Sequence, residues 1–380
     1  MKYKDMLKAY YYSISNEICL DKEFLNRENT SVLSFTPVRS IKTIALVKKY
    51  KINIVTYSFL ALVYFVFSPV FFLKSLMKNI IKLKKNKNSN IHDNVVLVAN
   101  RRVEYLYSKI KESINTDTTF LSINRVGSMH SIPFGFNLNL FDLIKAYMFS
   151  IVSMFYILIK LRNKTDIIQT YVAYEWFMTY ISLSKIKKDV KNVYFANHYD
   201  RWATLFEQLF YDKEVNLIQH GILPNNLSLV YKFKNIDKIY CYNNKSEVLF
   251  KKLFNAENII FERVSLSINL SEIKSRRKTM LIIGQPHCIE REIEIVKKLY
   301  NDFMIYIKPH PLYQDSAYYK VKGCEIIKDK NYYPKVDLAL SYESTLGMEY
   351  EASGITVLWW KELKVDEVVH LVKNIMDDKL

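Results

Sequence analysis

The sequence predicts an α/β protein with two domains, each built on a parallel sheet, and three observations lead to this prediction. Short apolar runs alternate along the chain with amphipathic helical patterns. The alternation is interrupted once, by a polar and basic stretch, and then restarts. The chain has 380 residues, a length that suits two domains of ordinary size. Strands that are separated by helices pair in parallel, with helices on both faces of the sheet.

The first predicted domain covers 1–266 and contains the longer series of strands. Each apolar run is followed by a helical pattern or a turn, as a parallel sheet requires. The predicted strands are 93–100, 118–124, 192–198, 215–221, 238–243 and 257–264, and the predicted helices between them include 101–113, 202–213 and 246–254.

The second predicted domain covers 279–380 and follows a linker at 267–278. The linker is polar and basic (SINLSEIKSRRK), which is typical of a connection between domains. Alternation then resumes with strands expected at 279–285, 303–311, 324–329, 336–344 and 355–360, and helices at 290–300, 345–354 and 365–378.

Composition narrows the classes of protein. Lys and Arg total 55 against 38 Asp and Glu, which gives a formal net charge of +17 and indicates an anionic partner. The four cysteines are scattered without a CxxC pair, so we expect neither a disulfide scaffold nor a zinc site. The first residues lack the apolar core and cleavage site of a secretory signal, so we expect a cytoplasmic protein.

Two apolar segments in the first domain indicate contact with a membrane. The segment 52–73 carries no charge and is long enough to span a bilayer, although Pro69 and the strand-like 52–58 weaken that interpretation. The segment 146–159 is too short to span. Lysines follow both, which favours helices lying on the inner face of the cell membrane. A true span at 54–73 and two simply buried helices remain the alternatives.

Polar residues follow several strands of the first domain, where ligands of open parallel sheets bind. His220 lies between Gln219 and Gly221; a positive φ at the glycine would leave the imidazole at the sheet edge as a candidate general base. Asp200 is the alternative base. His198, Arg201 and Arg101 are candidates for binding the substrate whose hydroxyl this base would deprotonate, called the acceptor below. For each of these, a structural role in a turn or helix start competes with the functional one.

The second domain has its own polar strand ends. Lys308 and His310 form a cationic, proline-braced end to the strand at 303–311, which suits a phosphate. Ser344 and Thr345 begin a predicted helix, whose N-terminus is an anion site, and Glu349 lies one turn further on. Gln285 follows the first strand and could also touch this ligand. Taken alone, Ser344 and Thr345 are better explained by helix capping.

Together, the QHG, KPHP and STxxxE motifs resemble those of GT-B glycosyltransferases of bacterial capsule, O-antigen and lipooligosaccharide biosynthesis. The likeness is to capsule sialyl- and Kdo-transferases and to CDP-glycerol glycerophosphotransferases, and it covers roughly 190–360. It implies two Rossmann-like domains that face each other and a nucleotide donor bound by the second domain. By resemblance, Lys308, His310, Ser344 and Thr345 would contact the donor phosphate and Glu349 the ribose.

The resemblance also implies the base and the need for a metal. His220 matches the histidine that glycerophosphotransferases are thought to use as base, whereas the acidic motif of sialyltransferases is missing from this sequence. GT-B enzymes do not usually need a metal, and the sequence has no D-x-D pair, so we expect neither a metal nor another cofactor.

The sequence therefore predicts an inverting, metal-independent glycosyltransferase that takes a sugar from a nucleotide donor, with a CMP-sugar favoured, to a surface or lipid-linked glycan. A CDP-glycerol-type glycerophosphotransferase is the alternative within this class. A basic nucleic-acid-binding protein is the alternative from another class, and the lack of a recognised binding motif disfavours it.

Overall fold

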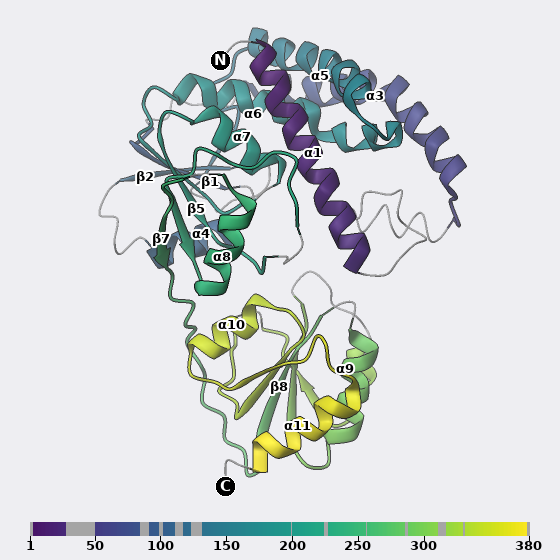
Figure 1. Ribbon diagram of the computed structural model, residues 1–380, viewed down its shortest axis with the longest axis vertical. Coiled ribbons are helices and arrows are strands. Elements are labelled where there is room, and N and C mark those ends of the chain that lie inside the picture. The colour runs from purple at the N-terminus through teal and green to yellow at the C-terminus, as the bar shows by residue number, and fades with distance from the viewer. Residues whose placement is uncertain are drawn as a thin grey trace. The chain divides into compact units, whose positions relative to one another are not determined.

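The chain divides into two compact units, Met1–Val264 and Ser265–Leu380 (Figure 1). The computed structural model describes residues 3–27, 50–83, 91–98, 102–110, 117–122, 131–198, 200–223, 227–255, 257–285, 288–310, 317–329 and 331–377.

The first unit is built on a seven-stranded parallel sheet of order β3-β2-β1-β4-β5-β6-β7. The interior strand β1, between β2 and β4, is buried along its whole length, as a strand with helices on both sides must be. Val95 and Leu97 of β1 join one apolar core and Val96 and Val98 join another, so the sheet separates two cores. The strands are β1 (Asn94–Val98), β2 (Thr118–Ser122), β3 (Ile132–Pro133), β4 (Asn192–Phe195), β5 (Glu214–Ile218), β6 (Lys238–Cys241) and β7 (Ile260–Arg263).

Most of the helical mass of this unit lies on one face of the sheet. The N-terminal helix α1 packs against α7, and α5 packs against both α6 and α3. Two further helices, α4 and α8, follow β1 and β6. The helices are α1 (Tyr3–Arg27), α3 (Ile54–Leu83), α4 (Arg102–Ile110), α5 (Leu140–Lys160), the 3-10 helix η3 (Lys164–Val172), α6 (Ala173–Ile186), α7 (Arg201–Leu209) and α8 (Asn244–Leu253).

The second unit has a five-stranded parallel sheet of order β10-β9-β8-β11-β12. Met280 and Ile282 of β8 pack with α9 and α11, while Leu281 and Ile283 pack in a separate core with α10. Figure 1 shows α9 and α11 on one face of this sheet and α10 on the other. The elements are β8 (Thr279–Ile283), α9 (Ile289–Leu299), β9 (Met304–Lys308), η4 (Tyr318–Lys320), β10 (Cys324–Ile326), β11 (Leu338–Ser341), α10 (Thr345–Ala352), β12 (Val357–Trp359) and α11 (Val365–Asp377).

The predicted fold class, with two parallel α/β units and apolar helices in the first, is confirmed. The mutual placement of the two sheets stays a prediction. The predicted linker packs along the second unit: Ile268 donates its N–H to Ser353 Oγ at 2.9 Å, and Ser271 donates its N–H to the Tyr333 carbonyl at 2.8 Å.

The apolar segment at 52–73 differs from the expectation in two ways. Its first residues are helical rather than strand-like, because α3 begins at Ile54 and runs without interruption to Leu83. Pro69 lies inside this helix, and the neighbouring Ser68 hydroxyl donates to the Phe65 carbonyl at 2.8 Å. The alternative that both apolar helices are buried is wrong, since only 17% and 39% of their most apolar windows are buried in α3 and α5.

Candidate active site

Two histidines from neighbouring strands meet at the carboxyl edge of the first sheet. Phe195 of β4 pairs with Leu217 of β5, and His198 and His220 each follow three residues later. The His220 N–H donates to His198 Nε2 at 2.8 Å, and the ring centroids are 4.2 Å apart. Because Nε2 of His198 accepts, its ring proton must be on Nδ1. His198 is buried, whereas His220 is partly exposed.

The turn that carries His220 is fixed by the side chain of Gln219. Gln219 Nε2 donates to the Gly221 carbonyl at 2.9 Å and to Ser246 Oγ at 3.0 Å, while its Oε1 accepts the Tyr242 N–H at 2.9 Å. The buried amide therefore joins the ends of β5 and β6 to α8. The positive φ expected at Gly221 is wrong, because among the described glycines only three others have one.

Asp200 has a capping role at the start of α7. Its Oδ1 accepts the N–H groups of Trp202 and Ala203 at 2.9 and 3.0 Å, and its Oδ2 accepts from Asn197 Nδ2 at 2.6 Å. These contacts occupy both carboxylate oxygens. They favour the structural interpretation of Asp200 over a role as base.

Arg201 lies inside the unit instead of at its surface. Its guanidinium donates to the backbone carbonyl and side-chain oxygen of Gln169 at 3.0 and 3.1 Å and lies 3.3 Å from Glu17. Burial lowers the pKa of Arg201, but the Glu17 carboxylate, Tyr171 and Tyr10 together outweigh burial, so the pKa rises overall. Only 5% of the residue is exposed, so the structure gives it a place in the core in contrast to the acceptor contact expected from sequence. Arg101, the other candidate cation, is outside the described residues.

The carboxyl edge of the second sheet brings Gln285 beside the start of α10. Gln285 Nε2 donates to the Glu343 carbonyl at 3.2 Å, which joins the ends of the neighbouring strands β8 and β11. The preceding Gly284 donates its N–H to the Lys308 carbonyl at 2.9 Å. A Cβ at Gly284 would lie 2.9 Å from Tyr318 Oη, so this close approach needs glycine.

Ser344 caps α10, as the sequence predicted for its structural role. Its hydroxyl accepts the Leu346 N–H at 3.3 Å, and its own N–H donates to Ser341 Oγ at 3.2 Å. Thr345 is the first residue of the helix and is partly exposed, while Glu349 is buried. A Cβ at Gly347 would lie 2.7 Å from Ser341 Oγ, so glycine lets the helix start pack directly on the strand end. The first-turn amides of α10 therefore lie at the sheet edge, where they can bind an anion.

Lys308 binds the backbone of a loop near the same edge of the sheet. Its ammonium donates to the carbonyls of Asp329 and Tyr332, both at 2.9 Å, and lies 4.6 Å from the centre of the Tyr333 ring. Burial lowers the pKa of this lysine. The side chain thus holds the loop after β10, and His310, two residues further and partly exposed, is the member of the KPHP motif that is nearer to solvent.

Sequence reasoning missed a buried carboxylate beneath this edge. Glu292 of α9 accepts the Gln285 N–H at 3.0 Å and also a hydrogen bond from the Tyr318 hydroxyl. Burial raises the pKa of Glu292 to about 7, although these two hydrogen bonds oppose the rise. The sequence contained a signal for this burial. Glu292 lies four residues from both Cys288 and Val296, and this spacing places its carboxylate on the apolar face of the helix.

The buried Glu292 gives a prediction on pH. Between the ordinary pKa of 4.5 and the native value of about 7, the folded chain keeps the proton and the unfolded chain loses it. The contribution of Glu292 to the free energy of unfolding should therefore be largest below pH 4.5. It should fall by about 3 kcal/mol as the pH rises through 7. Glu292→Gln should remove this fall in urea titrations across that range. The exposed Glu294→Gln on the same helix should keep it; an unchanged slope in Glu292→Gln would contradict the prediction.

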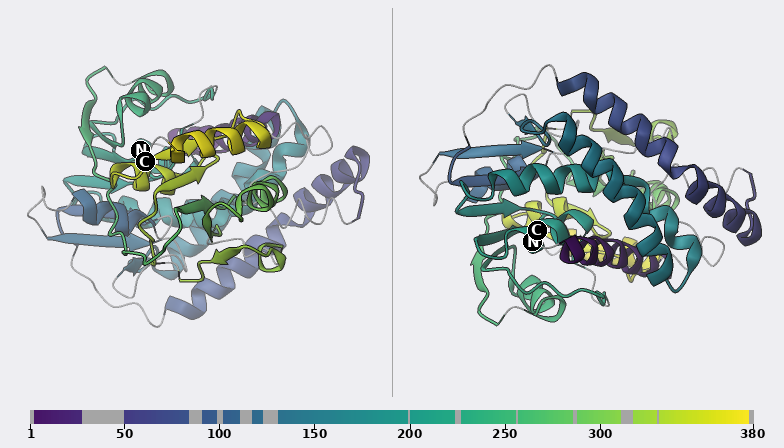
Figure 2. Two further views of the ribbon diagram at one scale, coloured as in Figure 1. Left: turned by 90° about the horizontal axis from the view of Figure 1, so that it is seen from below. Right: turned by 90° about the horizontal axis from the view of Figure 1, so that it is seen from above.

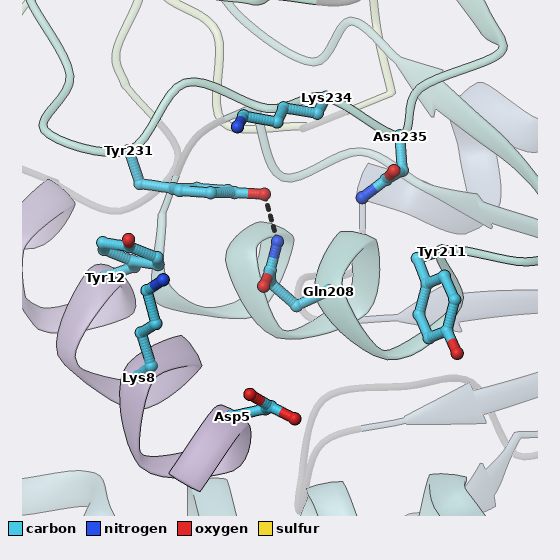
Figure 3. A pocket seen from close by; sticks show the side chains of 8 residues that line it. All are labelled: Asp5, Lys8, Tyr12, Gln208, Tyr211, Tyr231, Lys234 and Asn235. Atoms are coloured by element: carbon cyan, nitrogen blue, oxygen red, sulfur yellow. Dashed lines mark hydrogen bonds between the residues drawn. The ribbon is translucent and has the colours of Figure 1, made fainter. Parts of the chain in front are cut away.

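A separate cavity of about 430 Å³ lies in the first unit (Figure 3). The Tyr12 and Tyr231 rings stack beside it at 4.6 Å, and buried Glu207 accepts the N–H groups of Lys234 and Asn235, both at 2.9 Å. It is built from α1, the end of α7 and the segment before β6, which places it at the amino ends of the strands. It therefore holds none of the residues predicted from sequence.

Within the described ranges, no group of three or more His, Cys, Asp or Glu side chains could hold a metal ion. No family model and no curated protein matches the sequence.

The solved structures to which the chain is similar include three proteins at low identity. A wall teichoic acid polymerase, TagF, soaked with CDPG is 13% identical, with 77% of this chain and 78% of that one covered and a TM-score of 0.40. The UDP-GlcNAc 2-epimerase from Neisseria meningitidis bound to UDP-GlcNAc is 13% identical, with 75% and 91% covered and a TM-score of 0.43. TarM is 12% identical, with 53% and 51% covered and a TM-score of 0.35.

Proposed function

We propose that the chain is an inverting glycosyltransferase that takes a sugar from a nucleotide donor, with a CMP-sugar favoured, to a bacterial surface glycan. The observation that carries the proposal is that each of the two parallel sheets gathers polar groups at its carboxyl edge. The first edge has the His198–His220 pair, and the second has Gln285, His310 and the start of α10. Ligands of open parallel sheets bind at these edges.

In the proposed reaction, the second edge binds the donor. The first-turn amides of α10, with Ser344 and Thr345, bind the leaving phosphate. His310 adds a hydrogen-bond donor or a positive charge. Lys308 acts as a positioning residue, because its ammonium is bound to the carbonyls of Asp329 and Tyr332. Glu349 accepts from the ribose hydroxyls. This scheme requires no metal, since the N-terminus of α10 and His310 stabilise the negative charge that develops on the leaving phosphate.

The first edge activates the acceptor. His220 takes the proton of an acceptor hydroxyl, whose oxygen attacks the anomeric carbon of the sugar from the side opposite the phosphate. The bond between that carbon and the phosphate oxygen breaks, and its electron pair leaves with the nucleotide. His198 positions His220 through the 2.8 Å hydrogen bond to its backbone. His220 is preferred over Asp200 because both carboxylate oxygens of Asp200 are engaged in capping.

A second candidate is transfer of glycerol phosphate from a CDP-glycerol-type donor. This reaction is favoured by a histidine base where sialyltransferases have an acidic one, and the first edge has His198 and His220 side by side. In that case the acceptor hydroxyl attacks phosphorus, and CMP leaves.

The test is thermal unfolding with CMP, CDP, UDP, GDP and TDP. A ligand at one hundred times its Kd stabilises the folded chain by about 2.7 kcal/mol and raises the melting temperature. We expect CMP to give the largest rise in melting temperature. His310→Ala should raise the Kd for CMP at least tenfold and so reduce that rise, whereas the exposed His92→Ala is the control and should keep it. The largest rise with CDP would favour the glycerol phosphate reaction. No rise with any nucleotide would contradict the proposed function.

A further inference from the structure

Helix α3 exposes an apolar stripe along its whole length. The exposed side chains recur every three or four residues, which places them on one face of the helix. They are large as well as exposed, and Val55 and Ile81, near the two ends, are both 74% accessible. The stripe is Val55, Phe59, Leu62, Val66, Val70, Leu73, Met77 and Ile81.

Helix α5 adds a second apolar stripe beside the first. Phe155 of α5 contacts Phe65 of α3 with ring centroids 5.4 Å apart, yet Phe155 remains 56% exposed. Figure 2 shows the two helices next to each other in the view from above. The stripe of α5 is Phe141, Ile144, Met148, Val152, Phe155 and Ile159. Soluble monomers rarely leave a contiguous apolar patch of this kind open to water.

The charges on this double stripe are basic. Helix α3 has no acidic residue, and Lys74, Lys78 and Lys82 recur at intervals of four along its second half. The one acidic residue of α5, Asp142, is buried and paired with Lys185. Lys145 and Lys160 add two further cations to α5. Apolar side chains edged by lysines match an anionic lipid surface.

The opposite faces of both helices are packed against protein. On α3 the buried residues run from Tyr57 to Leu76, and the Tyr64 hydroxyl hydrogen-bonds Thr170 of η3 at 3.2 Å. On α5 they run from Asp142 to Ile157. A helix that crosses a bilayer while packed in this way would carry the hydrophilic sheet with it, so the packing favours helices that lie in the plane of the membrane.

The helical layer is also tied to the histidine edge. Thr170 follows Gln169 in η3, and Gln169 accepts two hydrogen bonds from Arg201 at the start of α7. Arg201 comes three residues after His198. Hydrogen bonds therefore connect α3 through η3 to Arg201, which lies three residues from His198 in the sequence.

We propose that the exposed faces of α3 and α5 form a docking surface that inserts into one leaflet of an anionic membrane and presents the histidine edge to a lipid-linked acceptor. The acceptor part rests on the proposed function. The docking part stands on the two stripes and their lysines alone.

The test is sedimentation of the full chain with phosphatidylcholine vesicles, with and without phosphatidylglycerol. Phe59→Ser/Val66→Ser/Val70→Ser should bind at least tenfold more weakly to both, because the three substitutions remove apolar surface that the membrane would bury. The matched control is Val230→Ser/Val248→Ser/Ile260→Ser, three equally exposed apolar residues elsewhere in the unit, which should bind as the wild type does. Lys74→Gln/Lys78→Gln/Lys82→Gln should lose only the preference for phosphatidylglycerol.

Two results would overturn the docking surface: a wild-type chain that stays in the supernatant, or equal binding by the α3 triple variant and its control. Release from cell membranes by alkaline carbonate is expected for a chain in one leaflet, and retention would overturn that geometry in favour of a span. Vesicle binding needs no donor, and nucleotide stabilisation needs no lipid, so failure of the docking surface and failure of the proposed function are distinguishable.

Discussion

His220→Ala is expected to lower the rate of sugar transfer by about 10²–10⁴-fold, the usual contribution of a general base. The loss should fall on kcat, because the imidazole would act on the proton that is transferred in the reaction, whereas the proposed nucleotide site lies in the other unit. Stabilisation of the chain by the nucleotide should therefore be unchanged. The measurement is release of the nucleotide from the donor in the presence of membranes that carry the acceptor.

Two further variants make this prediction specific. His370→Ala removes a histidine on α11, distant in sequence from both strand edges, and should transfer at the wild-type rate. His198→Ala removes the acceptor of the His220 N–H, so it should lower kcat less than His220→Ala does and alter the pH profile of kcat. Wild-type turnover by a folded His220→Ala chain would exclude this histidine as the base and return the role to Asp200.

Arg201→Met should destabilise the first unit by about 3–5 kcal/mol, because it leaves the buried Glu17 carboxylate without its counter-charge. The two residues are 184 positions apart and join α1 to the start of α7, so this pair connects distant parts of the unit. Urea denaturation of the first unit, followed by intrinsic fluorescence, measures the loss.

A double-variant cycle isolates the ion pair. Glu17→Gln/Arg201→Met should lose less stability than the sum of the two single variants, because no unpaired charge remains. Arg263→Met breaks an ion pair with Glu247 in which the arginine is 41% exposed, and it should cost under about 1 kcal/mol. A loss at Arg201 as small as that at Arg263 would show that the buried pair does not stabilise the unit.

The sheets could be predicted from the sequence because each strand is a local apolar run. Val95 to Val98 and Met280 to Ile283 are buried on both faces, and such strands stand out from the amphipathic helices around them. The start of α3 could not be predicted in this way. Its β-branched and aromatic residues match a strand locally, whereas packing of Tyr57 and Ala61 against the unit selects a helix.

The strand ends that carry the candidate residues could be located from the sequence, because each strand is a local apolar run. The partners of each side chain could not, since they come from distant segments. Arg201 looked like a surface cation beside His198, but Glu17 and Gln169 enclose it. Lys308 looked like a phosphate ligand, but carbonyls from the loop after β10 take its ammonium. These contacts depend on how the helices pack, which a local pattern does not contain.

The most direct test of the central claim is to locate the bound nucleotide by photocrosslinking with a 5-iodo analogue of CMP, followed by peptide mapping. We expect label on the second unit, in peptides that contain His310 or Ser344 to Glu349, and loss of that label when unmodified CMP competes. Label confined to Met1–Val264, or label that CMP does not displace, would contradict a donor site at the carboxyl edge of the second sheet.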